Sequence, residues 1–237
     1  MVPPISLCIP TMKRWDFLKN YLPNYLNNPY IHEIVICDET GEDIKKIQET
    51  YGNFSKLKLY TNEKRLGAFL NKEKVVRLAS NEWVCLVDSD NFVSKKYFEG
   101  WAKFLEGKDP DVKKIYAPSV ASNWNFTHFI GNAIIKKNVK EIYHKPSGGP
   151  LMNTGNYILH KSLMFLQIPD GQEKYPNECK AMDVLYRNYL CLKSGVQIHI
   201  IPEMEYSHIT HSGSYWSETA LQINQKLFEE LLFSLSD

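Results

Sequence analysis

The stretch that decides the fold reads Trp83-Val84-Cys85-Leu86-Val87-Asp88-Ser89-Asp90-Asn91. Five apolar residues, rich in β-formers, end abruptly in two carboxylates that are separated by one serine. A continuous apolar run of this length predicts a strand that helices cover on both faces. In an open α/β sheet the carboxyl ends of such strands line the ligand crevice. Two acids placed there either bind a hard cation or repel each other, so we expect a ligand site.

The chain before this stretch alternates between short apolar runs and amphipathic helical patterns. The expected strands are 5–9, 34–37 and 57–60, and the expected helices are 14–26, 44–51 and 68–79. Pro23 is expected to kink or split the first helix, because proline removes an intrahelical hydrogen bond. Strands and helices that alternate at this spacing predict a parallel sheet with helices on both faces.

Polar side chains gather at one edge of the expected sheet. Thr11 ends the first strand, Asp38 ends the second, and Asp88 and Asp90 end the fourth. Any one acid at such a point commonly has a structural role as a helix cap or turn residue. Three acids at the same edge favour a binding site for the set.

Composition argues against some classes of function. A formal net charge of +1 over 237 residues gives no electrostatic case for nucleic-acid binding. No apolar run approaches the ~18–20 residues that span a bilayer, and the first residues lack a signal-peptide pattern, so we expect a cytoplasmic protein. In that setting Cys8, Cys37 and Cys85, each inside an apolar run, are expected to be buried, reduced thiols.

Three motifs resemble those of a known family. They are Ile9-Pro10-Thr11 at the end of the first strand, Asn62 and Gly67 before the third helix, followed by Asn71, and Asp88-Ser89-Asp90 after the fourth strand. In this order they resemble the nucleotide-binding half of a GT-A fold glycosyltransferase of family 2, in which the third motif is the DxD motif. The resemblance implies an α/β, Rossmann-like fold with a mostly parallel central sheet and helices on both faces.

The resemblance also implies how the chain is divided. We expect a single compact domain over residues 1–237, made of two abutting halves. Residues from about 1 to 92 would bind the nucleotide-sugar, and residues from about 93 to 216 would bind the acceptor and carry catalysis. An amphipathic C-terminal helix is expected over 217–237.

A donor site with a divalent cation, Mn²⁺ or Mg²⁺, is implied by the same resemblance. Asp90 would bind the metal directly, and Asp88 would contact it through water or contact the ribose. Asp38 matches the position that contacts the nucleobase in relatives. The other residues expected around the donor, a UDP-sugar by family analogy, are Pro10, Thr11, Lys64, Arg65, Gly67 and Ser89. For Lys64 and Arg65, a solvated basic turn accounts for the sequence equally well.

The second half is less regular in sequence. A helix with an apolar core stripe is expected from 95 to 105 and a strand at 115–117, and residues 118–150 have the pattern of a long functional loop. Trp124 or His128 in that loop is a candidate for sugar contact. Gly149 precedes an expected strand at 151–159, where it either contacts the donor sugar, as the resemblance implies, or forms a turn.

The catalytic base is expected at the start of a helix over 179–193. Relatives carry an acid at this point, so the resemblance assigns the role to Asp183, with Glu178 and Glu173 as weaker candidates. A helix start also favours an acid through the helix dipole alone. A base at Asp183 would take the proton of the acceptor hydroxyl, and the anomeric carbon would be inverted.

A metal-binding histidine is expected after a strand at 196–201. Relatives commonly carry one in this region, and His208 is the first candidate and His211 the second. A histidine in this region is also compatible with a purely structural role. An imidazole that joins two carboxylates would favour Mn²⁺ over Mg²⁺.

The sequence therefore predicts a metal-dependent glycosyltransferase that moves a sugar from a nucleotide-sugar to a hydroxyl on a glycan or glycoconjugate. The alternative enzyme is a sugar-1-phosphate nucleotidyltransferase, which would carry a Gly-rich phosphate loop after the first strand. Residues 10–14 contain no glycine, which argues against a nucleotidyltransferase. The alternative from another class is a non-catalytic nucleotide- or glycan-binding module.

Overall fold

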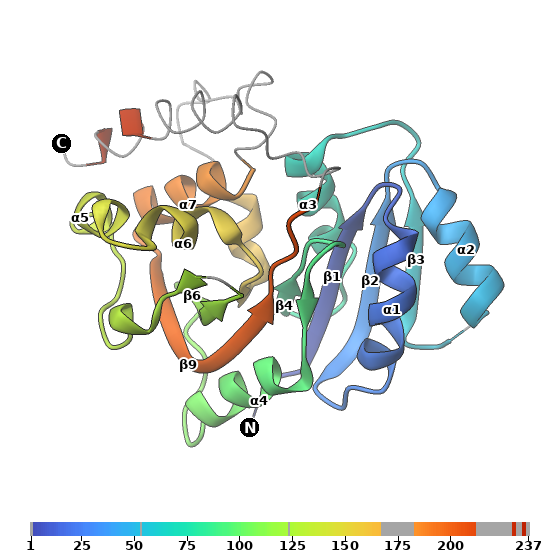
Figure 1. Ribbon diagram of the computed structural model, residues 1–237, viewed down its shortest axis with the longest axis horizontal. Coiled ribbons are helices and arrows are strands. Elements are labelled where there is room, and N and C mark those ends of the chain that lie inside the picture. Colours follow the sequence, from blue (N-terminus) through green and yellow to red (C-terminus); the bar gives the residue numbers. More distant parts are fainter. Residues whose placement is uncertain are drawn as a thin grey trace.

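The computed structural model describes residues 2–52, 54–122, 124–166, 183–211, 229–230 and 234–235. The strands are β1 (Ile5–Thr11), β2 (Ile31–Asp38), β3 (Leu57–Thr61), β4 (Trp83–Leu86), β5 (Phe92–Val93), β6 (Lys114–Ala121), β7 (Trp124–Asn125), β8 (Ile158–His160) and β9 (Gln197–Ser207). They form one sheet in the order β3-β2-β1-β4-β8-β6-β9-β5, and β7 pairs with β6 (Figure 1).

The helices follow the strands in alternation through the first half of the chain. They are α1 (Trp15–Leu26), α2 (Glu42–Tyr51), α3 (Ala68–Arg77), α4 (Lys95–Phe104), α5 (Val139–His144), α6 (Gly148–Thr154) and α7 (Asp183–Lys193), with 3-10 turns η1 (Thr127–Phe129) and η2 (Lys161–Phe165). Every residue of β1 is buried, which requires cover on both faces. In Figure 1, α1 lies in front of β2, while α3 packs against β1 and β2.

The parallel part of the sheet confirms the α/β prediction. β3, β2, β1 and β4 are all parallel neighbours, and β6 pairs in parallel with β9. The antiparallel pairs are short, and they join β8 to β4 and β6, β5 to β9, and β7 to β6. The sheet is therefore mostly parallel, and β8 joins its two parts.

Pro23 does not split α1, so that part of the expectation is wrong. The helix runs through it, and the amide of Asn27 donates to the carbonyl of Pro23. Proline cannot donate to the carbonyl four residues before it, which belongs to Lys19. The hydroxyl of Tyr51 donates to that carbonyl instead, at 3.3 Å, so α2 satisfies the freed acceptor.

The expected strand at 151–159 is wrong over most of its length. Residues 148–154 form α6, and the strand is confined to 158–160. Gly148 suits its position because a Cβ there would meet the carbonyl oxygen of Ile142 at 1.8 Å. Pro150 lies in the first turn, where its missing amide costs no intrahelical hydrogen bond.

The long loop expected over 118–150 is also more ordered than the sequence indicates. β6 continues through Pro118 to Ala121, and a register shift with β9 after Pro118 accommodates the proline. η1 and α5 occupy part of the rest.

β9 is longer than expected and bends toward the end of β4 (Figure 1). It passes Pro202, and Glu203 adopts a positive φ of 64° at the bend. Gly100 of α4 packs against this bend, since a Cβ on Gly100 would lie 2.9 Å from the carbonyl carbon of Glu203. The bend carries residues 208–211 to the edge where β4 ends.

The aromatic stripe of α4 is core, as the sequence predicts. Tyr97, Phe98 and Trp101 are fully buried.

The four cysteines within the described residues are buried free thiols. This holds for Cys8, Cys37 and Cys85, as expected, and for Cys191 as well. Burial raises the pKa of the Cys37 thiol to about 11 and the pKa of the Cys191 thiol to about 12. These thiols therefore stay protonated at neutral pH and pack as small apolar side chains.

Most of the helix expected over 217–237 lies outside the described residues, as do Glu173 and Glu178. Among the helices that the structure does describe, none combines the length and apolar character that crossing a bilayer requires.

Candidate functional site

A cavity of about 840 Å³ opens where β1, β2 and β4 end, and α6 and the start of α7 also line it. Ten residues that the sequence predicts as site residues lie in its wall: Pro10, Thr11, Arg65, Gly67, Asp88, Ser89, Asp90, Gly149, Asp183 and His208. The cavity is large enough for a ligand of nucleotide-sugar size. The structure therefore brings together segments that are far apart in the chain.

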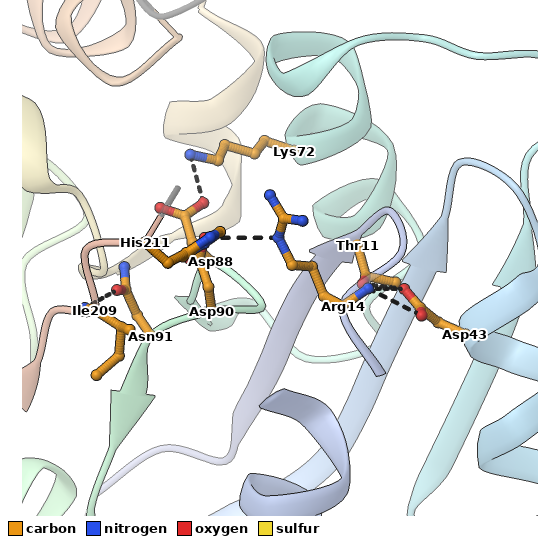
Figure 2. Close-up of polar contacts among 9 residues, drawn as sticks. All are labelled: Thr11, Arg14, Asp43, Lys72, Asp88, Asp90, Asn91, Ile209 and His211. Atoms are coloured by element: carbon orange, nitrogen blue, oxygen red, sulfur yellow. Dashed lines mark hydrogen bonds and ion pairs between the residues drawn. The ribbon is translucent and has the colours of Figure 1, made fainter. Parts of the chain in front are cut away.

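Segment 88–91 forms a tight turn after β4. The amide of Asn91 donates to the carbonyl of Asp88 at 2.9 Å, and the amide of Asp88 donates to the side-chain oxygen of Asn156 at 3.0 Å. The side-chain oxygen of Asn91 accepts from the amide of Ile209, also at 3.0 Å (Figure 2). Contacts from both sides thus fix the two acids of this segment at the cavity wall.

Asp90 lies between a histidine and an arginine. Its Oδ2 atom is 2.9 Å from Nε2 of His211 and 3.8 Å from Nε of Arg14 (Figure 2). His211 also packs on Phe17 of α1, with ring centroids 5.0 Å apart. Asp90 is thus held by the residue that precedes α1 and by the segment that follows β9.

Asp88 shares a cation with Asp183. Nζ of Lys72, on α3, lies 2.7 Å from Oδ1 of Asp88 and forms an ion pair with Oδ2 of Asp183. Burial alone lowers the pKa of Lys72, but the two carboxylates outweigh burial and hold its pKa above the usual value. Lys72 is therefore charged, and it places the candidate base beside the first acid of segment 88–91.

The loop after β1 is held by a buried acid that sequence reasoning missed. Oδ2 of Asp43 accepts from the hydroxyl of Thr11 at 2.6 Å, and the Asp43 carboxylate accepts from the amide of Arg14 at 3.0 Å (Figure 2). Asp43 lies in the first turn of α2, so this contact ties α2 to the cavity edge. An acid in the first turn of a helix is common, and its local sequence carries no sign of this contact.

Asp38 does not line the cavity, although the family resemblance implies that it contacts the nucleobase. It is fully buried at the end of β2. Its Oδ1 accepts from the amide of Thr40, and its Oδ2 accepts from the amides of Asp43 and Ile44. Both oxygens are occupied in holding the turn into α2, which is the structural role that any single acid at a strand end can take.

Glu39 lines the cavity instead of Asp38. Its Oε2 accepts from the amide of Leu66 at 2.7 Å and from Nδ2 of Asn62 at 3.3 Å. Asn62 in turn donates to Oδ1 of Asn71 at 3.0 Å. Gly67, with φ at 82°, allows the chain to turn into α3 directly after Leu66. The spaced Asn and Gly residues of the sequence motif therefore support a buried carboxylate at the cavity.

The remaining candidates divide by position. Lys64 and Arg65 lie on the same turn, and Arg65 lines the cavity whereas Lys64 does not. His208 lines the cavity, but its ring packs on Trp124, and its Nδ1 lies 3.4 Å from the Tyr206 hydroxyl. Burial lowers the pKa of His208, although Asp88 and Asp90 act in the opposite direction.

His128, by contrast, is exposed. Its Nε2 lies 3.1 Å from the carbonyl oxygen of Pro146, and it does not line the cavity. Of the two loop residues considered for sugar contact, Trp124 alone lies at the cavity.

Few side chains at the cavity are suited to bind a metal ion. Over the described residues, no three His, Cys, Asp or Glu side chains are grouped as a ready-made metal site. Asp88 and Asp90 offer carboxylate oxygens at the cavity, and His211 already contacts Asp90. Mg²⁺ and similar cations are commonly held by one or two carboxylates plus substrate phosphates, and the residues present fit that mode.

The sequence is similar to those of known glycosyltransferases. Residues 6–160 match the model of the family described as Glycosyl transferase family 2. An uncharacterized glycosyltransferase, MG060, of Mycoplasma genitalium is 29% identical over 116 residues, and the match covers 46% of this chain and 39% of that protein. The match thus spans less than half of that relative's length.

A second relative matches nearly the whole chain. It is the dolichyl N-acetyl-alpha-D-glucosaminyl phosphate 3-beta-D-2,3-diacetamido-2,3-dideoxy-beta-D-glucuronosyltransferase of Methanococcus voltae, 25% identical over 96% of this chain and 76% of that protein.

Two solved structures share the fold. S. aureus TarS 1-349 in complex with UDP-GlcNAc has a TM-score of 0.66 at 17% identity, covering 98% of this chain and 70% of that chain. The mannosyltransferase PcManGT from Pyrobaculum calidifontis, in complex with GDP-Man and Mn²⁺, has a TM-score of 0.63 at 17% identity, covering 99% and 64%. The GT-A fold expected from the sequence is confirmed.

Proposed function

The chain belongs to glycosyl transferase family 2, and we propose that it transfers a sugar from a nucleotide-sugar to a hydroxyl group on a glycan or glycoconjugate. The observation that carries the proposal is the contact of one ammonium, that of Lys72, with both Asp88 and Asp183. This contact supports the proposal because Asp183, the proposed base, then lies near Asp88, one of the acids that would hold a donor diphosphate. Transfer requires both groups in one cavity.

The proposed donor is a UDP-sugar. The solved structures with this fold contain UDP-GlcNAc in one case and GDP-Man in another, so the fold accommodates both nucleotides. In this chain Glu39 and Gly67 line the part of the cavity where the nucleobase would lie, and Glu39 accepts from the amide of Leu66. A buried carboxylate there suits a base edge that presents an N–H donor, which uracil and guanine both do, so the choice of UDP follows from the family resemblance.

Asp88 and Asp90, with His211 beside Asp90, would hold Mn²⁺ or Mg²⁺ together with diphosphate oxygens. When bound there, such a cation would supply neutralisation of the charge on the departing nucleoside diphosphate. Arg14 adds a positive charge on the same side of the cavity, near Asp90.

Asp183 would act as the general base. The acceptor oxygen attacks the anomeric carbon, the bond from that carbon to the diphosphate breaks, and the acceptor proton moves to the Asp183 carboxylate. One displacement of this kind inverts the anomeric carbon. Asp183 is suited to the role because it lies at the cavity at the start of α7.

The two alternatives are less well supported by the geometry. In a nucleotidyltransferase the loop after the first strand would offer free backbone amides to phosphate, but the Asp43 carboxylate occupies the amide of Arg14. A pure binding module has no need of an acid placed as Asp183 is. Neither alternative uses the contact of Lys72 with both acids.

A thermal-shift screen tests the proposal, because a ligand that binds the folded state raises the melting temperature. UDP, GDP, UDP-GlcNAc and GDP-Man are compared with and without Mn²⁺. We expect UDP and a UDP-sugar to give the larger shifts, and only with Mn²⁺. Release of UDP from the sugar, followed by phosphorus NMR, separates an enzyme from a binding module. No shift and no release with any of these donors would refute the proposed function.

A further inference from the structure

Lys72 is a buried lysine whose charged end lies among functional acids. The residue is 9% exposed, and it lines the cavity from α3. Figure 2 shows its ammonium directed at Asp88, and the same nitrogen is paired with Asp183. Burial of a lysine is tolerated only where its charge is matched, and here the match comes from two carboxylates.

A second lysine in the protein shows the contacts of a structural role. Nζ of Lys56 donates to the carbonyls of Tyr25, Leu26 and Asn28, at 3.2, 3.0 and 2.7 Å. These neutral groups close the end of α1. Within the described part of the chain, Lys72 makes no such backbone contact, and its ammonium instead pairs with the two aspartates that the proposed chemistry uses.

Asp183 depends on Lys72 for its position. Oδ2 of Asp183 is buried and accepts no hydrogen bond from another described residue, so the ion pair with Lys72 is the polar contact that orients it. Without the ammonium, Asp88 and Asp183 would face each other as two like charges in a poorly solvated place. They would move apart, or one would take up a proton.

We propose that Lys72 is a positioning residue that ties the base, Asp183, to the donor-binding acid, Asp88, and that it competes with a divalent cation for Asp88. The inference rests on the proposed function of the same cavity. Lys72 holds one oxygen of Asp183 and leaves the other for the acceptor proton. Because the same ammonium holds Asp88, the spacing between base and donor is set by one side chain.

Three variants test this inference. Lys72→Met removes the charge and keeps most of the side-chain volume, and Lys72→Arg keeps the charge. Lys74→Met is the matched control, since Lys74 lies on the same helix and does not line the cavity. Melting temperatures establish that each variant is folded. The readouts are release of the nucleoside diphosphate from UDP-GlcNAc, or from whichever tested nucleotide-sugar the wild type cleaves, and calorimetric binding of Mn²⁺ alone.

For Lys72→Met we expect kcat to fall by about 100-fold or more, with KM for the donor changed by less than about threefold. Mn²⁺ alone should bind about tenfold more tightly, because a competing charge next to Asp88 is gone. Lys72→Arg should recover kcat to within about tenfold of the wild type, and Lys74→Met should match the wild type.

Three results would overturn the inference. They are an unchanged kcat in a folded Lys72→Met protein, a rise in donor KM that accounts for the whole loss, and weaker or unchanged Mn²⁺ binding. A merely structural defect would weaken Mn²⁺ binding and lower kcat together. Failure of the proposed function is distinguishable, because the wild type itself would then cleave none of the donors.

Discussion

Nε2 of His211 lies 2.9 Å from Oδ2 of Asp90, although the two residues are 121 positions apart. The ring of His211 packs on Phe17 at the same time. The segment after β9 thus contacts both α1 and the acids that follow β4. Of the two histidines predicted from the sequence, His211 contacts an acid of segment 88–91, while His208 packs on Trp124.

His211→Ala is expected to weaken Mn²⁺-dependent UDP binding by about tenfold to 100-fold, because the histidine that orients Asp90 is lost. His208→Ala is the comparison, and it should have the smaller effect. Isothermal calorimetry with UDP, at fixed Mn²⁺, measures both. A larger loss in His208→Ala would reverse the assignment.

Asp90→Ala is expected to abolish Mn²⁺-dependent UDP binding while the protein remains folded. The carboxylate is the proposed direct ligand, so its loss should lower affinity by at least about 100-fold. Asp16→Ala is a suitable control, since Asp16 is exposed and forms its ion pair with Lys19, away from the cavity. Equal metal-dependent affinity in Asp90→Ala and wild type, measured by calorimetry, would reject Asp90 as a ligand.

Asp183→Asn is expected to lower kcat by about 10²- to 10⁴-fold, because the amide cannot accept the acceptor proton. UDP binding should change little, since the proposed donor contacts lie on other residues. The wild-type product should have the inverted anomeric configuration, which proton NMR reads from the anomeric coupling. Retention of configuration would contradict a single displacement assisted by Asp183.

Substitutions of Asp38 and Glu39 are expected to change different properties of the protein, the free energy of unfolding for Asp38 and the preference for UDP or GDP for Glu39. Asp38→Ala should lower the free energy of unfolding by about 2 kcal/mol, because the backbone amides that it caps lose their acceptor. Its ratio of UDP to GDP affinity should stay as in the wild type. Glu39→Gln should shift that ratio, with a smaller effect on unfolding. Denaturant titrations and calorimetry together give both quantities, and the opposite pattern would restore Asp38 as the nucleobase contact.

Glu33 is expected to make stability depend on pH at the acid end. Burial acts to raise the pKa of Glu33, but hydrogen bonds from the Ser6 hydroxyl and the Ser80 amide outweigh it and lower the pKa. A carboxyl whose pKa is lower in the folded state stabilises the fold above its unfolded pKa of about 4.3. That contribution disappears as pH falls through the folded-state pKa.

Denaturant unfolding of wild type and Glu33→Gln over about pH 7 to 3 measures this effect. The stability advantage of the wild type should be largest near pH 7 and should shrink below about pH 4.3. A constant difference across that range would show that Glu33 does not carry the pH dependence.

The centre of the parallel sheet was predictable because β1, β2 and β4 each contain a mostly apolar run. β1 and β2 are buried at nearly every position, and only a strand covered on both faces places so many consecutive apolar residues in a core of this kind. β5 and β7 are two residues long, which is too short for an apolar or alternating pattern to be recognised in the sequence. α6 was missed because Gly148 and Pro150 indicate a turn from sequence, and only the packing against Ile142 makes a helix there favourable.

The segments that form the site were predictable from the sequence, but the side chains that face the cavity were predictable only in part. Asp88, Asp90 and Asp183 lie at the cavity as expected, since strand ends and a helix start fix their place. Asp38 and Glu39 are adjacent in sequence, and which of them faces the cavity depends on the turn into α2. The contact of Lys72 with Asp88 and Asp183 joins three distant segments, and no local pattern records such a contact.

The turn at 88–91 can be completed only late in synthesis. Asn156 and Ile209 hold this turn, and both leave the ribosome long after β4 does. β4 itself pairs on one side with β8, which is made about as late as Asn156. A nascent chain that ends before residue 209 therefore lacks the amide that donates to Asn91. The last of the hydrogen bonds that hold this turn forms only once that residue has emerged.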